Sequence, residues 1–164
     1  MKYSVGDMFP SVTFNWLDEK YNFNKQDSNK LFENRKIILI GMPGAFSPAC
    51  SMGHLPGFID SFQLFRNKGI DEIYCVVVND IYVAKSWSDS TGSGKAGIKV
   101  ITDPLSILAE ELDAEFSVKG TGLLRRLQRF TMILNDRKIE KLYLEKERGV
   151  CDLTSAKSIL NDLN

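Results

Sequence analysis

A proline, a serine and a cysteine lie at a spacing that suits nucleophilic chemistry. Pro43, Ser47 and Cys50 fall in a turn-rich segment that directly follows a buried apolar run. A cysteine in the first turn of a helix meets free N–H groups and the positive end of the helix dipole, which favour the thiolate over the thiol. The thiolate is the nucleophilic form, so we predict that Cys50 attacks an electrophile. Ser47 can place a hydroxyl beside the sulfur, and the ring of Pro43, which fixes φ and removes a donor, can shield it.

The segments on either side of Cys50 predict a strand followed by a helix. The apolar run at 36–41 is short and continuous, as expected of a strand that is buried on both faces. After the turn, apolar side chains recur at mostly helical spacing over 48–68, and Gly69 is a suitable C-terminal stop. Open α/β sheets place their sites beyond the carboxyl ends of strands, which is where Cys50 falls.

The rest of the chain continues to alternate between strand and helix patterns. The further expected elements are a strand at 73–78, a helix from an Asn79-Asp80 cap through Trp87, a strand at 98–101, a helix from Asp103-Pro104 to about Leu112, a hairpin of 130–134 and 139–144, and a last helix at 156–163 capped by Thr154 or Ser155. This order predicts an α/β, thioredoxin-like fold with a central mixed sheet flanked by helices. We expect one domain over 1–164.

Composition and cysteine count exclude several classes of function. Lys plus Arg and Asp plus Glu both number 21, so no global field draws the chain to nucleic acid or to a membrane. The N-terminus lacks the apolar core of a signal peptide, which predicts a cytoplasmic protein, or an organellar one if a targeting segment has been removed. Three cysteines, one histidine and no Cys-x-x-Cys predict reduced thiols, with no metal and no cofactor.

The cysteine segment carries a family resemblance. Residues 43–50 read PGAFSPAC and fit the pattern Pro-x-x-x-Thr/Ser-x-x-Cys, and HLPGF follows at 54–58. These strings resemble the peroxiredoxins, specifically the type 5 (plant type II) class, and CVVVND at 75–80, Trp87 and RFTM at 129–132 extend the similarity over nearly the whole chain. The resemblance implies a thiol peroxidase that reduces hydrogen peroxide and alkyl hydroperoxides through a sulfenic acid.

The resemblance also assigns roles within the site. It implies that Cys50 is the peroxidatic cysteine, Ser47 its hydroxyl partner and Pro43 its shield. Arg129 is then the guanidinium that steadies the thiolate and the transferred oxygen. A cation suits this place, because O–O cleavage builds negative charge on the leaving oxygen.

Two other interpretations of the site remain to be tested. His54 lies one turn after Cys50 and could be the base of a cysteine hydrolase or acyl transferase. We interpret it instead as a structural residue behind the reacting groups, because a thiolate needs no base as strong as imidazole. A redox sensor or thiol chaperone is the alternative that is not an enzyme. The cluster Arg125-Arg126-Leu-Gln-Arg129 could be a solvated face or a weak anion patch, and Arg129 adjoins a predicted strand, which allows it to point into a site.

The partner that regenerates the thiol is less defined. Cys75 lies 25 positions after Cys50, the spacing of the second cysteine in the plant type II branch, and Cys151 falls near the resolving cysteine of the animal branch. We favour an external thiol, either glutathione with glutaredoxin or a thioredoxin. The resemblance also implies a homodimer that joins the active-site ends of two subunits. Trp87 and the Gly-rich stretch 91–97 are candidate interface residues, although Trp87 equally suits the core of one subunit.

Overall fold

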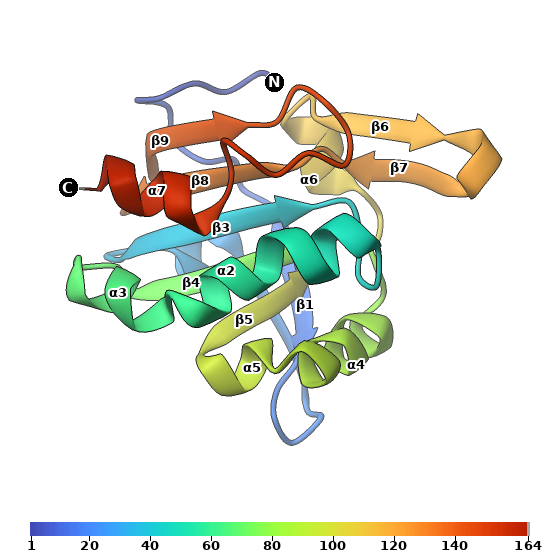
Figure 1. Ribbon diagram of the computed structural model, residues 1–164, viewed down its shortest axis with the longest axis horizontal. Helices are drawn as coiled ribbons and strands as arrows, with labels where there is room; N and C mark the ends of the chain where they lie inside the picture. The colour runs from blue at the N-terminus through green and yellow to red at the C-terminus, as the bar shows by residue number, and fades with distance from the viewer. Residues whose placement is uncertain (164) are drawn as a thin grey trace.

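The structure is a computed structural model that describes residues 1–163, and its centre is a seven-stranded mixed sheet (Figure 1). The strand order is β2-β1-β5-β4-β3-β8-β9. The three inner strands β3, β4 and β5 run parallel, and the other neighbours pair antiparallel. The strands are β1 (Thr13–Leu17), β2 (Phe23–Asp27), β3 (Lys36–Met42), β4 (Glu72–Val77), β5 (Ile98–Thr102), β8 (Phe130–Asn135) and β9 (Lys138–Leu144).

Helices cover both faces of this sheet, so the expected α/β architecture is confirmed. In Figure 1, α2 to α5 and α7 lie in front of the strands and α6 lies behind them. A hairpin of β6 (Glu115–Val118) and β7 (Leu123–Leu127) extends beyond the sheet. The helical segments are α1 (Ser28–Leu31), η1 (Ala49–His54), α2 (Leu55–Asp60), α3 (Phe62–Asn67), α4 (Ile81–Thr91), α5 (Ser93–Ala96), α6 (Ile107–Glu111), η2 (Lys119–Thr121) and α7 (Ala156–Asp162).

The apolar residues of β3 supply both layers of the core. Successive side chains of a strand point to opposite faces. Ile37 and Leu39 therefore pack into one buried cluster, and Ile38 and Ile40 into the other, which also contains Cys50. Because both faces are covered, every position from 37 to 42 is buried. This burial on both faces explains why β3 appears in the sequence as a continuous apolar run.

The helix expected over 48–68 is divided into three segments. Its first turns form a π-helix, in which Leu55 N–H donates to the carbonyl of Cys50 five residues earlier. Pro56 lies in the first turn of α2 and has no N–H to give to the carbonyl four residues before it. A wider turn before the proline accommodates that missing bond. A second break falls at Ser61, between α2 and α3.

The starts of two other helices, α6 and α7, also bear on the sequence predictions. The helix expected at Asp103-Pro104 begins only at Ile107, because Ser106 adopts a positive φ of 58°. The Asp103 carboxylate still accepts the first free N–H groups of α6, from Ile107 at 2.8 Å and Leu108 at 3.0 Å. Of the two possible caps for α7, Ser155 is the one used.

Trp87 belongs to the core of the subunit. Its side chain has no exposed surface, and its indole N–H donates to the Ser51 hydroxyl at 2.9 Å. The interface interpretation of Trp87 is therefore wrong. α4 begins at the expected Asp80 cap, which accepts from Tyr82 and Val83, and it continues past Trp87 to Thr91. No helix within residues 1–163 is long and apolar enough to cross a membrane.

Candidate active site

Cys50 lies just beyond the carboxyl end of the central strand β3. The strand pairs antiparallel with β8, and its Gly41 is opposite Phe130. A Cβ atom at Gly41 would lie only 2.2 Å from the Phe130 ring, so glycine allows this close approach. The register brings Arg129, which precedes Phe130, beside the end of β3. The sheet itself therefore places the guanidinium next to the cysteine.

Arg129 bridges Cys50 and His54. Its Nη2 donates to Cys50 Sγ at 3.3 Å, and its Nη1 lies 2.9 Å from His54 Nδ1. The arginine is 5% exposed and Cys50 is fully buried. Among the described residues no carboxylate forms an ion pair with Arg129. Its charge is therefore directed at the sulfur, where it favours the anion.

His54 is held as a neutral ring that receives a hydrogen bond from Arg129. Its Nε2 lies 2.8 Å from the Thr154 carbonyl, which can only accept, so Nε2 carries the proton and Nδ1 accepts from Arg129. Burial, and then the charge of Arg129, lower the pKa of His54 to about 4. Both ring nitrogens are thus engaged away from the sulfur. The geometry contradicts a Cys–His hydrolase and supports a structural role for this histidine.

Glu145 fixes the loop that carries Thr154. One oxygen of its buried carboxylate accepts from Asp152 N at 2.7 Å and from Thr154 N at 2.9 Å. Burial alone would raise the pKa of Glu145, but hydrogen bonds from Thr154 and Asp152 outweigh it and lower this pKa. The carboxylate is thus occupied by the loop, and the loop in turn orients His54 and Arg129.

Ser47 and Pro43 line a cleft beside the buried sulfur. The Ser47 hydroxyl donates to the Gly44 carbonyl at 3.3 Å and makes no hydrogen bond to Cys50 Sγ. The role of Ser47 as the hydroxyl partner of the sulfur stays a prediction. Pro43 is half-buried, as a shield at the mouth requires.

The cleft has a volume of about 540 Å³. Arg129, which donates to Cys50 Sγ, forms part of its wall, whereas the buried Cys50 does not line the cleft. Sequence reasoning missed the charged lining residues at 145–148, because their segment carries no motif. The lining residues are Pro43, Gly44, Ala45, Ser47, Pro48, Ala49, Asn79, Phe116, Leu123, Arg126, Gln128, Arg129, Glu145, Lys146, Glu147, Arg148 and Gly149.

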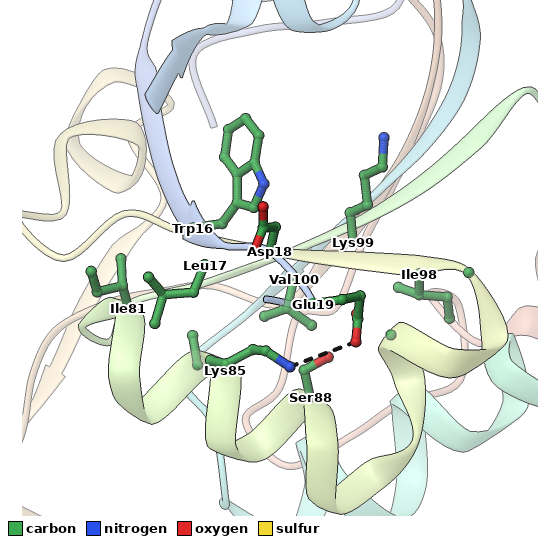
Figure 2. A pocket seen from close by; sticks show the side chains of 13 residues that line it. Trp16, Leu17, Asp18, Glu19, Ile81, Lys85, Ser88, Ile98, Lys99 and Val100 are labelled. Carbon is green, nitrogen blue, oxygen red and sulfur yellow. Dashed lines mark ion pairs between the residues drawn. The ribbon is translucent and has the colours of Figure 1, made fainter. Parts of the chain in front are cut away.

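A second cleft, of about 260 Å³, lies between β1, α4 and β5 (Figure 2). Its one buried cation, Lys85, is paired with Asp89 on α4 at 2.5 Å and with Glu19 at 3.8 Å, the ion pair drawn in Figure 2. None of the candidate catalytic residues lines this cleft. The candidate catalytic residues Pro43, Ser47 and Arg129 line the first cleft instead.

The other two cysteines differ in access. Cys75 lies on β4 in the same apolar cluster as Cys50 and is fully buried. Burial, followed by the nearby Cys50, raises the pKa of the Cys75 thiol far above its usual range. Cys151 is half-buried in the loop before α7, and burial raises its pKa as well. All three thiols are free.

Comparison with known proteins decides the family. The Redoxin family model matches residues 4–160. Peroxiredoxin-2B of Arabidopsis thaliana is 36% identical over 160 residues, which are 98% of each chain. The chain belongs to the peroxiredoxin family. The likeness to the type 5, or plant type II, class is thereby confirmed.

Solved structures agree with this assignment. Reduced Prx3 of Vibrio vulnificus, in complex with hydrogen peroxide, matches with a TM-score of 0.92 and 29% identity over 99% of both chains. A 1-Cys peroxiredoxin of Plasmodium falciparum matches with a TM-score of 0.88 and 28% identity, over 96% of this chain and 98% of that one. The fold is therefore the thioredoxin-like fold of peroxiredoxins, and this peroxiredoxin is a thiol peroxidase.

Proposed function

We propose that Cys50 is the peroxidatic cysteine of this peroxiredoxin and that it reduces hydrogen peroxide and alkyl hydroperoxides. The observation that carries the proposal is the Arg129 guanidinium, 3.3 Å from Cys50 Sγ and without a carboxylate partner in the described chain. A buried, unneutralised cation at this distance stabilises negative charge on sulfur. It also stabilises the charge that develops on the peroxide oxygens during cleavage.

The proposed reaction transfers one oxygen atom to sulfur. The thiolate attacks the terminal peroxide oxygen, an S–O bond forms and the O–O bond breaks. The leaving oxygen takes a proton and departs as water or an alcohol, while Cys50 is oxidised by two electrons to a sulfenic acid. Arg129 donates hydrogen bonds as the charge moves from sulfur to the leaving oxygen.

Ser47 and Pro43 complete the proposed site. The Ser47 hydroxyl lies at the cleft wall and its bond to the Gly44 carbonyl is long, at 3.3 Å. A change of its χ1 rotamer turns the hydroxyl toward an incoming peroxide, to which it can donate. Pro43 has no N–H and so offers no competing donor at the mouth of the site.

We propose that an external thiol, glutathione with glutaredoxin or a thioredoxin, regenerates Cys50. The external thiol attacks the sulfenic sulfur, water leaves, and a second thiol then breaks the mixed disulfide. Burial of Cys75 and the raised pKa values of both other cysteines disfavour their thiolates, which are the attacking species. The likeness to a 1-Cys peroxiredoxin also supports this choice.

Single cysteine replacements test both parts of this proposal. We expect Cys50→Ser to abolish hydroperoxide consumption with dithiothreitol, whereas Cys75→Ser and Cys151→Ser keep most activity with glutathione and glutaredoxin. A sensor or chaperone would not turn over under these conditions. If Cys75→Ser or Cys151→Ser stops turnover with every external thiol, the one-cysteine mechanism is wrong. After one equivalent of peroxide, mass spectrometry should find a sulfenic acid and no intramolecular disulfide.

We also propose a homodimer formed through the carboxyl edge of the sheet. Three large apolar residues follow the parallel strands β3, β4 and β5, and all are exposed: Phe46 by 56%, Tyr82 by 71% and Leu105 by 69%. The carboxyl ends of adjacent parallel strands meet at one edge, so these residues, the edge patch, lie on the active-site side of the molecule. Aromatic and apolar side chains are typical of interface cores, and two-fold dimers are the commonest oligomers.

We propose the cytoplasm, or an organelle, as the place of action. Three free thiols suit a reducing compartment. A rice relative that is 36% identical over 163 residues is named as chloroplastic. Imaging of a fluorescent fusion would test this placement.

A further inference from the structure

We propose that the cleft beside Cys50 selects hydroperoxides that carry a carboxylate, such as fatty-acid hydroperoxides, and that Arg126 binds this carboxylate. The inference rests on the proposed peroxidatic role of Cys50 and names a substrate class for the same site. Three features of the cleft carry it: its apolar lining, its unpaired cations and the geometry of Arg126.

The lining suits an aliphatic chain. Six of the wall residues are apolar, and they come from the cysteine loop and from the β6–β7 hairpin. The cleft volume, about 540 Å³, falls in the usual range of about 300–1,000 Å³ for pockets that enclose a small organic ligand. Hydrogen peroxide needs none of this space. The apolar wall residues are Pro43, Ala45, Pro48, Ala49, Phe116 and Leu123.

The charge on the walls is positive and largely unpaired. Arg126, Lys146 and Arg148 line the cleft, and none of them forms an ion pair within residues 1–163. Of the two acidic residues in the lining, Glu145 is already engaged by the backbone of Asp152 and Thr154. An apolar cleft with free cations on its wall matches a molecule that has an apolar chain and an anionic end.

Arg126 differs from its neighbour in a way that points to a ligand. The exposed Arg125 donates to Glu115 at 2.9 Å and to Glu110 at 3.0 Å. Arg126 turns toward the cleft, where its Nη1 donates only to the Val78 carbonyl and its buried Nε has no partner. A guanidinium that is partly desolvated and lacks a carboxylate gains most from a bidentate anion.

The cysteine loop leaves room for this guanidinium. A Cβ atom added at Gly44 would lie 3.2 Å from Arg126 Nη1, so the arginine packs directly over the loop backbone. Arg126 and Arg129 line the same cleft, and Arg129 contacts Cys50 Sγ. A substrate can therefore place its carboxylate at the first arginine and direct its peroxide group toward the second.

A matched pair of substrates tests the inference. The 13-hydroperoxide of linoleic acid and its methyl ester differ only in the charged end. We expect kcat/KM of the wild-type enzyme to be about tenfold higher for the acid, the range of one hydrogen bond to a charged group. Arg126→Met should bring the ratio close to one, and Arg126→Lys should restore part of it. Arg125→Met removes the same charge outside the cleft and should leave the ratio unchanged.

A binding measurement separates this inference from the peroxidase proposal. In the Cys75→Ser, Cys151→Ser background, linoleate should slow alkylation of Cys50 by iodoacetamide, whereas methyl linoleate should not. The protection should disappear in Arg126→Met. Equal rates for acid and ester in the wild type, or an unchanged ratio in Arg126→Met, would overturn the inference. So would an Arg126→Met effect confined to the KM of glutathione, because the bound carboxylate would then belong to the reductant.

Discussion

The chemistry at Cys50 depends on what surrounds one arginine. Arg129 has a thiol on one side and a neutral imidazole on the other, where a carboxylate could have stood. An adjacent carboxylate would neutralise the guanidinium and weaken its hold on a thiolate. His54 accepts a hydrogen bond from Arg129 without cancelling its charge. This is a physical reason for a buried histidine that takes no part in proton transfer.

The charge state of His54 is open to direct measurement. Its pKa is lowered to about 4, and it is the one histidine of the sequence, so a single imidazole resonance reports it by NMR. We expect no titration between pH 7 and pH 5. The buried ring is surrounded by Arg129, the Thr154 carbonyl and, farther away, Glu145. A midpoint near 6.5 would contradict the assigned hydrogen bonds.

The same shift makes stability depend on pH. Between pH 6.5 and 4 the unfolded chain takes up a proton at His54 that the native state does not, so the free energy of unfolding falls as the pH falls. A shift of this size corresponds to about 3 kcal/mol. His54→Gln should remove that part of the decline, which urea titrations at several pH values would measure against the wild type.

The sequence predicted which residues come together at the candidate site better than it predicted the hydrogen bonds that they make. The motif indicated Pro43, Ser47 and Cys50, and the resemblance added Arg129; the structure places Pro43, Ser47 and Arg129 in the wall of one cleft, with Cys50 buried against Arg129. The direction of the Ser47 hydroxyl was not predictable, because a serine rotamer depends on which acceptor is near. Arg126 was grouped with Arg125 because a string of cations does not reveal which members find a carboxylate.

Among the elements, the buried strands were the predictable ones. β3 and β4 are covered on both faces and appear in the sequence as apolar runs. The β1–β2 and β6–β7 hairpins were missed, because β2 and β7 are short, partly exposed strands without an alternating apolar pattern. The division of the long helix was also missed. Its cause, Pro56, was visible, but the wider π turn is a compensation that depends on the packing around Cys50.

The pairing of β3 with β8 can be tested where Gly41 lies opposite Phe130. Gly41→Ala places a methyl group against the Phe130 ring, within 2.2 Å of one of its atoms. We expect a loss of about 1–3 kcal/mol in the free energy of unfolding, because a packed core resists added volume. Gly120→Ala is the matched control, since no atom lies within 4 Å of its Cβ position. Equal denaturation midpoints for the two variants would contradict this description of the sheet.

For the whole molecule, the proposed dimer makes the edge patch a testable surface. Light scattering should give twice the 18.5 kDa of one chain. Leu105→Glu places a charge in the edge patch and should shift the mass toward the monomer. Leu64→Glu is the control, because Leu64 is 53% exposed on α3, away from the carboxyl edge. A monomeric wild type at high concentration would overturn the dimer without affecting the peroxidase.

The closed apolar cluster around Cys75 has a consequence for how the enzyme fails. Under the proposed one-cysteine mechanism no thiol of the same molecule attacks the sulfenic acid at Cys50, which therefore reacts with whichever reagent reaches it first. A thiol from solution restores the enzyme, and a second peroxide drives the sulfur to the sulfinic acid, which is a dead end without a dedicated repair enzyme. The odds at each cycle depend on the ratio of thiol to peroxide outside the protein. The fraction of molecules that is still active therefore falls with each exposure in which peroxide reaches the sulfenic acid before a thiol does.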